Sequence, residues 1–189
     1  GYHQFTNLKP GIEYVVKFEA PIGTDFVLTS PNKGSDLSDS DANLVDGKTS
    51  TIVLSSGENN TTIDAGFYLP ARIGDYVWND LNANGIQEGA GGIFAGEESG
   101  IPGVIVVLTG TDGAGNSVYL TTTTGPNGEY LFDGLAPGNY TVTFTSPPSF
   151  ESSPSDNASN DDSDSDANPV TGASPIIVLE SDDNVTIDA

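Results

Sequence analysis

The stretch GEYLFDGLAPGNYTVTF, residues 128–144, decides the fold class. Its last five residues, YTVTF, alternate apolar side chains with threonines, which is the period of a β-strand that buries one face. The Pro-Gly pair at Pro137 and Gly138 marks a turn just before that strand. The stretch therefore predicts two strands joined by a tight turn.

The rest of the chain also consists of short segments that favour β-strands. Short runs rich in Thr, Val, Ile, Tyr and Phe are interrupted by 23 Gly and 12 Pro, and no run keeps helical spacing over eleven or more positions. The class predicted is all-β. In the second part of the chain, strands are expected at 72–78, 104–109, 118–124, 130–133, 139–146, 175–179 and 184–189. Seven short strands are typical of an Ig-like antiparallel β-sandwich.

The chain also repeats itself in three blocks that occur in the same order. The matching pairs are FTNLKPGIEYVVKFEAP (5–21) with FDGLAPGNYTVTFTSP (132–147), SDSDANLV (38–45) with SDSDANPV (163–170), and IVLSSGENNTTIDA (52–65) with IVLESDDNVTIDA (177–189). Such a match indicates tandem units. Residues 1–70 are predicted to be the C-terminal half of one β-sandwich repeat, and residues 71–189 a nearly complete second repeat.

Half a sandwich needs further strands to cover its core. The opening GYHQF corresponds to GEYLF in the middle of the second unit. We therefore expect partner strands to come either from neighbouring repeats of the same chain or from other copies of it, by strand complementation or in a polymer. The sequence leaves both routes open.

The charge balance excludes several classes of partner. The chain carries 27 acidic residues against five Lys and Arg, so it would repel a phosphate backbone, and nucleic acid and anionic membranes are ruled out. No apolar run approaches the 18 residues or so of a membrane span, so membrane insertion is not expected. There is no Cys, and hence no disulfide or thiol chemistry.

Several strings together resemble one known family. They are IGDYVWND (73–80), LNANGIQ (81–87), GIPGVIVVLTG (100–110), GEYLFDGLAPGNYTVTF (128–144) and TIDAGF (62–67). The chain is similar to the B-type repeat of the serine-aspartate repeat surface proteins, within the wider CnaB-like, prealbumin-like sandwich group. The resemblance implies tandem sandwiches that act as calcium-rigidified spacers in a wall-anchored or secreted bacterial protein.

The clearest local motif has the spacing of an EF-hand-like calcium loop. Asp80, Asn82 and Asn84 supply oxygen donors at positions one, three and five, Gly85 allows the sharp turn, and the Ile86 carbonyl would be the ligand at position seven. Position twelve is not acidic, so either Glu97 or Glu98 would have to fold back to close the site. The alternative is a plain Asn-rich turn. Hard oxygen donors favour Ca²⁺.

A second acidic cluster occurs once in each repeat. Its candidate cation ligands are Asp161, Asp164 and Asp166 in the second copy and Asp36, Asp39 and Asp41 in the first. A solvated acidic loop and a further cation site both fit this composition. For Asp64 and Asp188, in the repeated TIDA, a structural role is favoured over ligation.

These patterns predict a structural protein that is not an enzyme. Tandem units with calcium-type loops favour a spacer, stalk or filament-forming repeat at the cell surface or secreted. The alternative is an adhesin module that binds a host or matrix protein or glycan, which exposed aromatic side chains would support. Trp78 is expected in the core. The acids lie in polar loops where nothing would raise a catalytic pKa.

Overall fold

The chain forms two compact units built from strands and turns. The computed structural model describes residues 2–88, 98–155 and 163–189, and within these ranges there is no helix, so none that could cross a membrane. The two units are Gly1–Leu69 (unit 1) and Pro70–Ala189 (unit 2). The predicted all-β class is confirmed.

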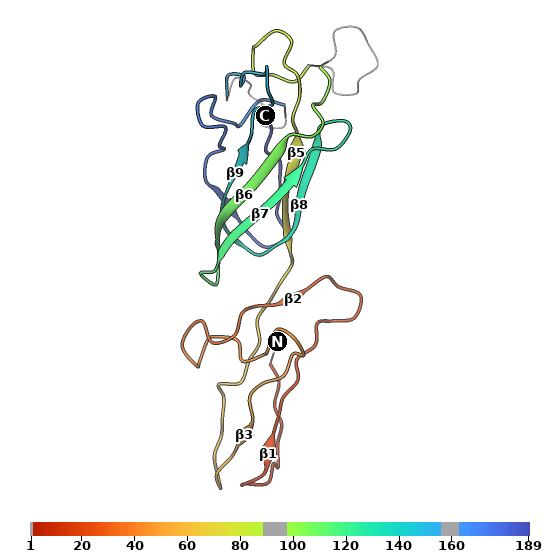
Figure 1. Cartoon of the computed structure of the whole chain (residues 1–189). Coiled ribbons are helices and arrows are strands. Elements are labelled where there is room, and N and C mark those ends of the chain that lie inside the picture. Colours follow the sequence, from red (N-terminus) through yellow and green to blue (C-terminus); the bar gives the residue numbers. More distant parts are fainter. Residues whose placement is uncertain (1, 89–97, 156–162) are drawn as a thin grey trace. The chain divides into compact units, whose positions relative to one another are not determined.

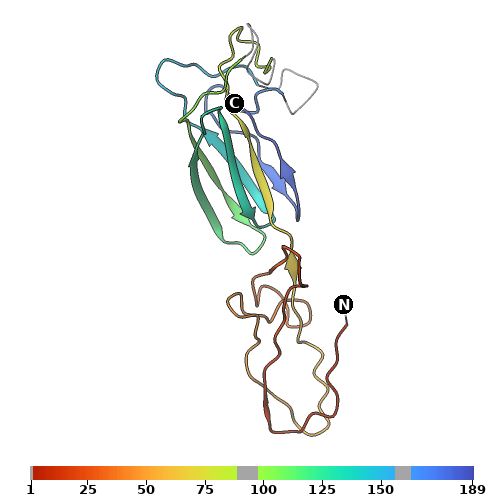
Figure 2. The same ribbon diagram turned by 90° about the vertical axis from the view of Figure 1, so that its right-hand side faces the viewer.

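Unit 2 is a sandwich of two sheets (Figures 1 and 2). One sheet has four strands in the order β10-β9-β6-β7 and the other has three in the order β11-β5-β8. The strands are β5 (Ala71–Tyr76), β6 (Ile105–Asp112), β7 (Ser117–Thr123), β8 (Glu129–Leu135), β9 (Gly138–Phe144), β10 (Ile177–Leu179) and β11 (Asn184–Val185). Each lies within a few residues of a strand expected from the sequence.

The last strand differs most from expectation. The regular ladder of β11 ends at Val185 and runs parallel to β5, whereas every other ladder in the unit is antiparallel. Further along, Trp78 N–H donates to the Ala189 carbonyl over 3.0 Å, and Ala189 N–H donates to the Tyr76 carbonyl over 3.2 Å. The Tyr76 N–H donates to the side chain of Asp188. In a regular ladder this N–H would donate to a main-chain carbonyl of the neighbouring strand.

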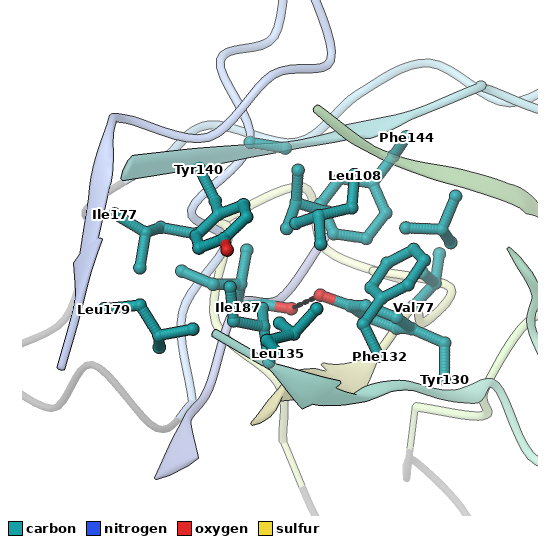
Figure 3. Close-up of a cluster of buried hydrophobic side chains, with 14 of the residues drawn as sticks. Val77, Leu108, Tyr130, Phe132, Leu135, Tyr140, Phe144, Ile177, Leu179 and Ile187 are labelled. Carbon is teal, nitrogen blue, oxygen red and sulfur yellow. Dashed lines mark hydrogen bonds between the residues drawn. The ribbon is translucent and has the colours of Figure 1, made fainter. Parts of the chain in front are cut away.

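The core lies between the two sheets, and Tyr130 of β8 is one of its buried aromatic side chains (Figure 3). The Tyr130 ring meets Phe132 and Phe144 edge-on, with ring centroids 5.9 and 5.5 Å apart. Its hydroxyl donates to the Ile187 carbonyl, which ties β8 to the C-terminal segment. The inward face predicted for YTVTF is confirmed, since Tyr140, Val142 and Phe144 are all buried, and so is the core position of Trp78.

Unit 1 has much less regular structure. Its strands are β1 (Glu13–Tyr14), β2 (Val27–Leu28), β3 (Ile52–Val53) and β4 (Phe67–Tyr68). They pair only as β1 with β3 and β2 with β4, each pair antiparallel. Ladders of two residues cannot cover a hydrophobic face, because an isolated two-stranded ribbon is at best marginally stable in water.

The buried hydroxyl of Tyr130 gives a test of this packing. Tyr130→Phe keeps the ring and leaves the Ile187 carbonyl without its donor, so we expect it to cost unit 2 about 1–2 kcal/mol of unfolding free energy. Urea unfolding followed by the fluorescence of the single tryptophan, Trp78, measures this unit. Tyr119→Phe is the matched control, because Tyr119 is 72% exposed; equal effects of the two changes would contradict the assignment.

Candidate metal centre

The loop that follows β5 is folded around the carboxylate of Asp80. Its Oδ2 accepts the Gly85 N–H at 2.8 Å, and its Oδ1 accepts the N–H groups of Asn82 and Asn84 at 3.2 and 3.3 Å. Gly85 has a φ of 76° and Ala83 a φ of 57°. Two residues in the left-handed conformation therefore let the chain reverse direction sharply. The tight loop forms at this point because an Asp at its start can accept hydrogen bonds from several of the N–H groups that follow.

Competing effects set the ionisation of Asp80. Burial raises the pKa of its carboxyl, but the hydrogen bonds from Gly85 N–H, the Ser153 hydroxyl and the N–H groups of Ala83 and Asn84 lower it, and the net pKa lies below the ordinary value. Hydrogen bonds to the charged form favour ionisation. Asp80 is therefore held as a carboxylate, the form that binds a cation.

The two asparagines continue the same pattern along the loop. Asn82 Oδ1 accepts the Asn84 N–H at 3.0 Å, and Asn84 Oδ1 accepts the Ile86 N–H at 2.8 Å. Their amide nitrogens donate to the two carboxylate oxygens of Glu88, at 3.1 and 2.6 Å. Sequence reasoning did not place Glu88 in the site, although it stands at position nine of the loop spacing, where an EF-hand provides a ligand, often through water.

Glu98 closes the loop from outside it. Its Oε1 accepts the Leu81 N–H at 2.8 Å and its Oε2 accepts the Glu88 N–H at 3.1 Å, so one side chain joins the two ends of the loop. It is only 4% exposed, and burial raises its pKa, with Glu88 and Asp80 adding to the rise. Of the two glutamates expected to fold back, Glu98 makes these contacts, and Glu97 lies outside the described residues.

The structure joins the two acidic regions that the sequence treated separately. Ile86 forms an isolated antiparallel bridge with Asp164. On either side of it, Gln87 N–H donates to the Ser163 carbonyl at 2.8 Å and Ser165 N–H donates to the Gly85 carbonyl at 3.0 Å. The calcium-type loop and the DSDAN segment therefore form one platform at an end of the sandwich. Asp161 lies outside the described residues.

Behind that platform, Asp166 and Asp188 bind each other through reciprocal hydrogen bonds. Asp166 N–H donates to the Asp188 carbonyl at 3.0 Å, and Asp188 N–H donates to Asp166 Oδ2 at 2.8 Å. Asp188 Oδ1 accepts the Tyr76 N–H at 3.1 Å. Burial raises the pKa of Asp188 to about 8, and the nearby charges of Asp75, Asp166 and Asp164 add to the rise.

Unit 1 repeats these reciprocal bonds at the matching residues. Asp41 N–H donates to the Asp64 carbonyl at 2.9 Å, and Asp64 N–H donates to Asp41 Oδ2 at 2.9 Å. Burial raises the pKa of Asp41, with Asp64, Asp39 and Asp36 adding to the rise. The other two sequence-predicted acids of this unit, Asp36 and Asp39, thus lie near enough to Asp41 for their charges to act on it, and Asp36 is exposed.

The donors suit calcium in kind, although they do not surround a common point. Carboxylate, amide and main-chain oxygens are the ligands that Ca²⁺ accepts, in six- to eight-fold and flexible geometry. Among residues 2–88, 98–155 and 163–189, no three or more His, Cys, Asp or Glu side chains are arranged to hold a metal ion. Binding would therefore require the side chains to turn inward from their bonds to main-chain N–H groups.

Comparison with known proteins gives a consistent family. The model of the SdrD B-like domain matches residues 1–67 and 71–189. The serine-aspartate repeat-containing protein F of Staphylococcus epidermidis is 42% identical over 149 residues, 78% of this chain. The serine-aspartate repeat-containing protein D of Staphylococcus aureus is 37% identical over 190 residues, 100% of this chain. The chain spans only 8% and 13% of the length of these two relatives.

Among solved structures, the minor pilin GBS52 of Streptococcus agalactiae is similar at a TM-score of 0.38 and 12% identity, over 76% of this chain and 63% of the pilin chain. A likeness at this level carries no argument about function.

The contacts of Glu98 predict its effect without any metal. Glu98→Ala leaves the Leu81 and Glu88 N–H groups without acceptors, so we expect faster hydrogen exchange at these two amides in a chelator and a loss of about 1–3 kcal/mol of stability. Nuclear magnetic resonance resolves the two amides individually. Glu151→Ala, at an exposed position, is the control, and unchanged exchange at both amides in the Glu98 variant would refute the assigned contacts.

Proposed function

The chain belongs to the SdrD B-like domain family, and from that premise we propose that it is a calcium-braced structural module, a spacer or filament-forming repeat of an extracellular bacterial surface protein. The single observation that carries the proposal is the platform at the end of unit 2. There, loop 80–88 and residues 163–166 are paired through main-chain bonds and held by the carboxylates of Asp80 and Glu98.

The charge at this platform explains why a cation would stabilise it. Burial and the nearby charges of Glu88 and Asp80 raise the pKa of Glu98, and unit 2 contains one basic residue, Arg72, and no Lys. A divalent ion would neutralise part of this negative charge, which the single basic side chain of the unit cannot balance. Because it would bind the folded loops and not the unfolded chain, its binding free energy would add to the stability of the module.

The proposed ligands are those expected from the sequence, with one addition. In unit 2 they are Asp80, Asn82, Asn84, the Ile86 carbonyl, Glu88 and Glu98 for the loop, and Asp164 and Asp166 beside it. In unit 1 they are Asp36, Asp39 and Asp41. Glu97 and Asp161 remain sequence predictions.

The role proposed is mechanical and non-enzymatic. Its support is the kinship with serine-aspartate repeat-containing proteins of staphylococci and the use of the buried acids as acceptors for main-chain N–H groups. A location on the cell surface or in a secreted assembly follows from the same kinship.

An adhesin module is the alternative, and one residue favours it. Tyr119 of β7 is a largely exposed aromatic side chain on the outer face of the four-stranded sheet. Aromatic side chains are enriched where proteins bind one another. One aromatic side chain on this face gives less support than the repeated acidic loops give to the structural role.

Unit 1 supports the further proposal that its partners are strands of another repeat. Phe5 is 62% exposed, whereas the matching Phe132 of unit 2 is 5% exposed. Leu8 and Ile12 are likewise exposed beside the Pro-Gly turn, although Leu135 is buried. An apolar face of this kind needs the equivalents of β5, β6 and β7, which a neighbouring repeat or another copy of the chain would add.

Calcium removal tests the main proposal. At a Ca²⁺ concentration about 100 times the dissociation constant, binding would add roughly 2.7 kcal/mol per site, so we expect the thermal midpoint of unit 2 to fall by on the order of 10 °C when the whole chain is moved into a chelator. Differential scanning calorimetry with Trp78 fluorescence measures it. Mg²⁺ is the control divalent ion, and we expect it to restore little of the lost thermal midpoint. A thermal midpoint that is the same with and without calcium would contradict the proposal and would indicate that the loops are solvated turns.

A covalent fusion tests the completion of unit 1. Because Gly1 matches Gly128, residues 71–127 placed directly before Gly1 would supply the missing strands in the correct order. We expect this fusion to protect the amides of residues 5–18 from hydrogen exchange and to abolish binding of a hydrophobic dye. The control fusion carries Val106→Asp and Leu108→Asp in the added segment, since both positions are fully buried in unit 2. Equal protection in the two fusions would count against strand completion.

A further inference from the structure

A cavity of about 440 Å³ lies in unit 2 between the end of the core and the segment that follows β9. Its walls include Trp78, Phe144, residues 149–154 and Ala189. The indole N–H of Trp78 is buried and has no hydrogen-bond partner among the described residues. A volume of this size with largely apolar walls is typical of a binding site, and a buried donor without an acceptor is uncommon in a complete structure.

In unit 1 the matching place is occupied by a strand of the chain itself. β4 follows the TIDA block at 62–65 after one residue and pairs antiparallel with β2. Beside this ladder, the Thr29 N–H donates to the Gly66 carbonyl at 2.9 Å. A Cβ added to Gly66 would lie 2.5 Å from the Thr29 hydroxyl oxygen, so the segment approaches its neighbour as closely as only glycine permits.

Unit 2 has counterparts of both partners at the cavity. The stretch FESSP at 150–154 matches FVLTSP at 26–31, which contains β2 and is one residue longer. Ala189 ends the second TIDA block, as Ala65 ends the first. Residues 150–154 and Ala189 both line the cavity, and the described part of unit 2 places no strand between them. The cavity therefore lies where a counterpart of β4 would pair.

Main-chain bonds confirm that the two units correspond on both sides of this place. The N–H of Phe18 donates to the Gly47 carbonyl, and the N–H of the matching Phe144 donates to the Gly172 carbonyl, each at 2.8 Å. Both TIDA blocks are held by the same reciprocal aspartate bonds. The comparison thus rests on equivalent contacts as well as on matching letters.

We propose that the cavity of unit 2 binds an extended, uncharged peptide segment with the chemistry of residues 66–69, Gly-Phe-Tyr-Leu. In unit 1 this segment leads directly into the next unit, so the partner at unit 2 is the connecting segment of a further repeat. Strand addition would supply main-chain bonds to residues 151–153, and the apolar walls would take the aromatic side chains. The inference goes beyond the proposed calcium bracing, because it needs no ion.

The charge of the segment supports this choice of partner. Residues 65–71 contain no charged side chain, although the chain as a whole has a net charge of −22. Asp80 and Glu151 are among the cavity residues, and they would repel most other segments of so acidic a chain. A segment without charge avoids this repulsion, and its carbonyl groups are acceptors of the kind that the Trp78 indole lacks.

The test compares two extended forms of the whole chain with the unaltered chain. One form is extended after Ala189 by Gly-Phe-Tyr-Leu-Pro, the sequence of residues 66–70. The control extension has Asp in place of both aromatic residues. Trp78 fluorescence, hydrogen exchange at the amides of residues 151–153 and the thermal midpoint are measured with calcium present throughout.

We expect the aromatic extension to slow exchange at these amides by about tenfold or more and to move the Trp78 emission to shorter wavelength. It should raise the thermal midpoint of unit 2 by on the order of 5 °C, because aromatic surface becomes buried. The control extension should behave as the unaltered chain does.

A change in the cavity wall makes the same test from the other side. Phe150 is 41% exposed, so Phe150→Ala should alter the midpoint of the unaltered chain little, yet it should remove most of the rise that the aromatic extension gives. Leu131→Ala is the matched control, since Leu131 is 50% exposed on β8 and does not line the cavity; it should leave that rise intact.

Two results would overturn the inference. Equal exchange, fluorescence and midpoint in the two extended chains would mean that the cavity does not take this segment and belongs to another ligand. A raised midpoint without protection of residues 151–153 would mean that the aromatic side chains bind without adding a strand. Neither result bears on the calcium proposal, which removal of the ion tests separately.

Discussion

The reciprocal hydrogen bonds between Asp166 and Asp188 are the contact on which the end of unit 2 depends. They fix the acidic segment against the C-terminal strand. Asp188 Oδ1 accepts the Tyr76 N–H, which places that strand beside β5. The loop of Asp80 then rests on the acidic segment through the Ile86–Asp164 bridge. Removing this contact would leave three segments without a common support, and the recurrence of the same bonds between Asp41 and Asp64 makes it a property of the repeat.

Much of the fold was predictable from the sequence because side-chain alternation and turn residues are local signals. YTVTF revealed both a strand and its buried face, and Trp78 was correctly expected in the core. The parallel pairing of β11 with β5 was not predictable, since it joins residues more than a hundred positions apart and leaves no local pattern. For the same reason the sequence showed two acidic regions but not that main-chain bonds place them side by side.

Only those residues of the candidate site that follow a regular motif spacing could be predicted from the sequence. Regular spacing pointed to Asp80, Asn82 and Asn84, and the need for a closing acid pointed to Glu97 or Glu98. Glu88 was missed because a ligand at position nine has no fixed residue type. For Asp188, in the repeated TIDA, a structural role was favoured over ligation, but its burial near Asp75 and Asp166 could not be predicted because it arises only from the tertiary fold.

The parallel pairing of β5 with β11 has a mechanical consequence for unit 2. β5 is the first strand of unit 2 and β11 the last, so tension between Pro70 and Ala189 pulls the two strands in opposite directions along their length. The bonds from Arg72 N–H to the Asp183 carbonyl, from Trp78 N–H to the Ala189 carbonyl and from Ala189 N–H to the Tyr76 carbonyl are then sheared together instead of opening one after another. Such a geometry resists extension until several bonds break together.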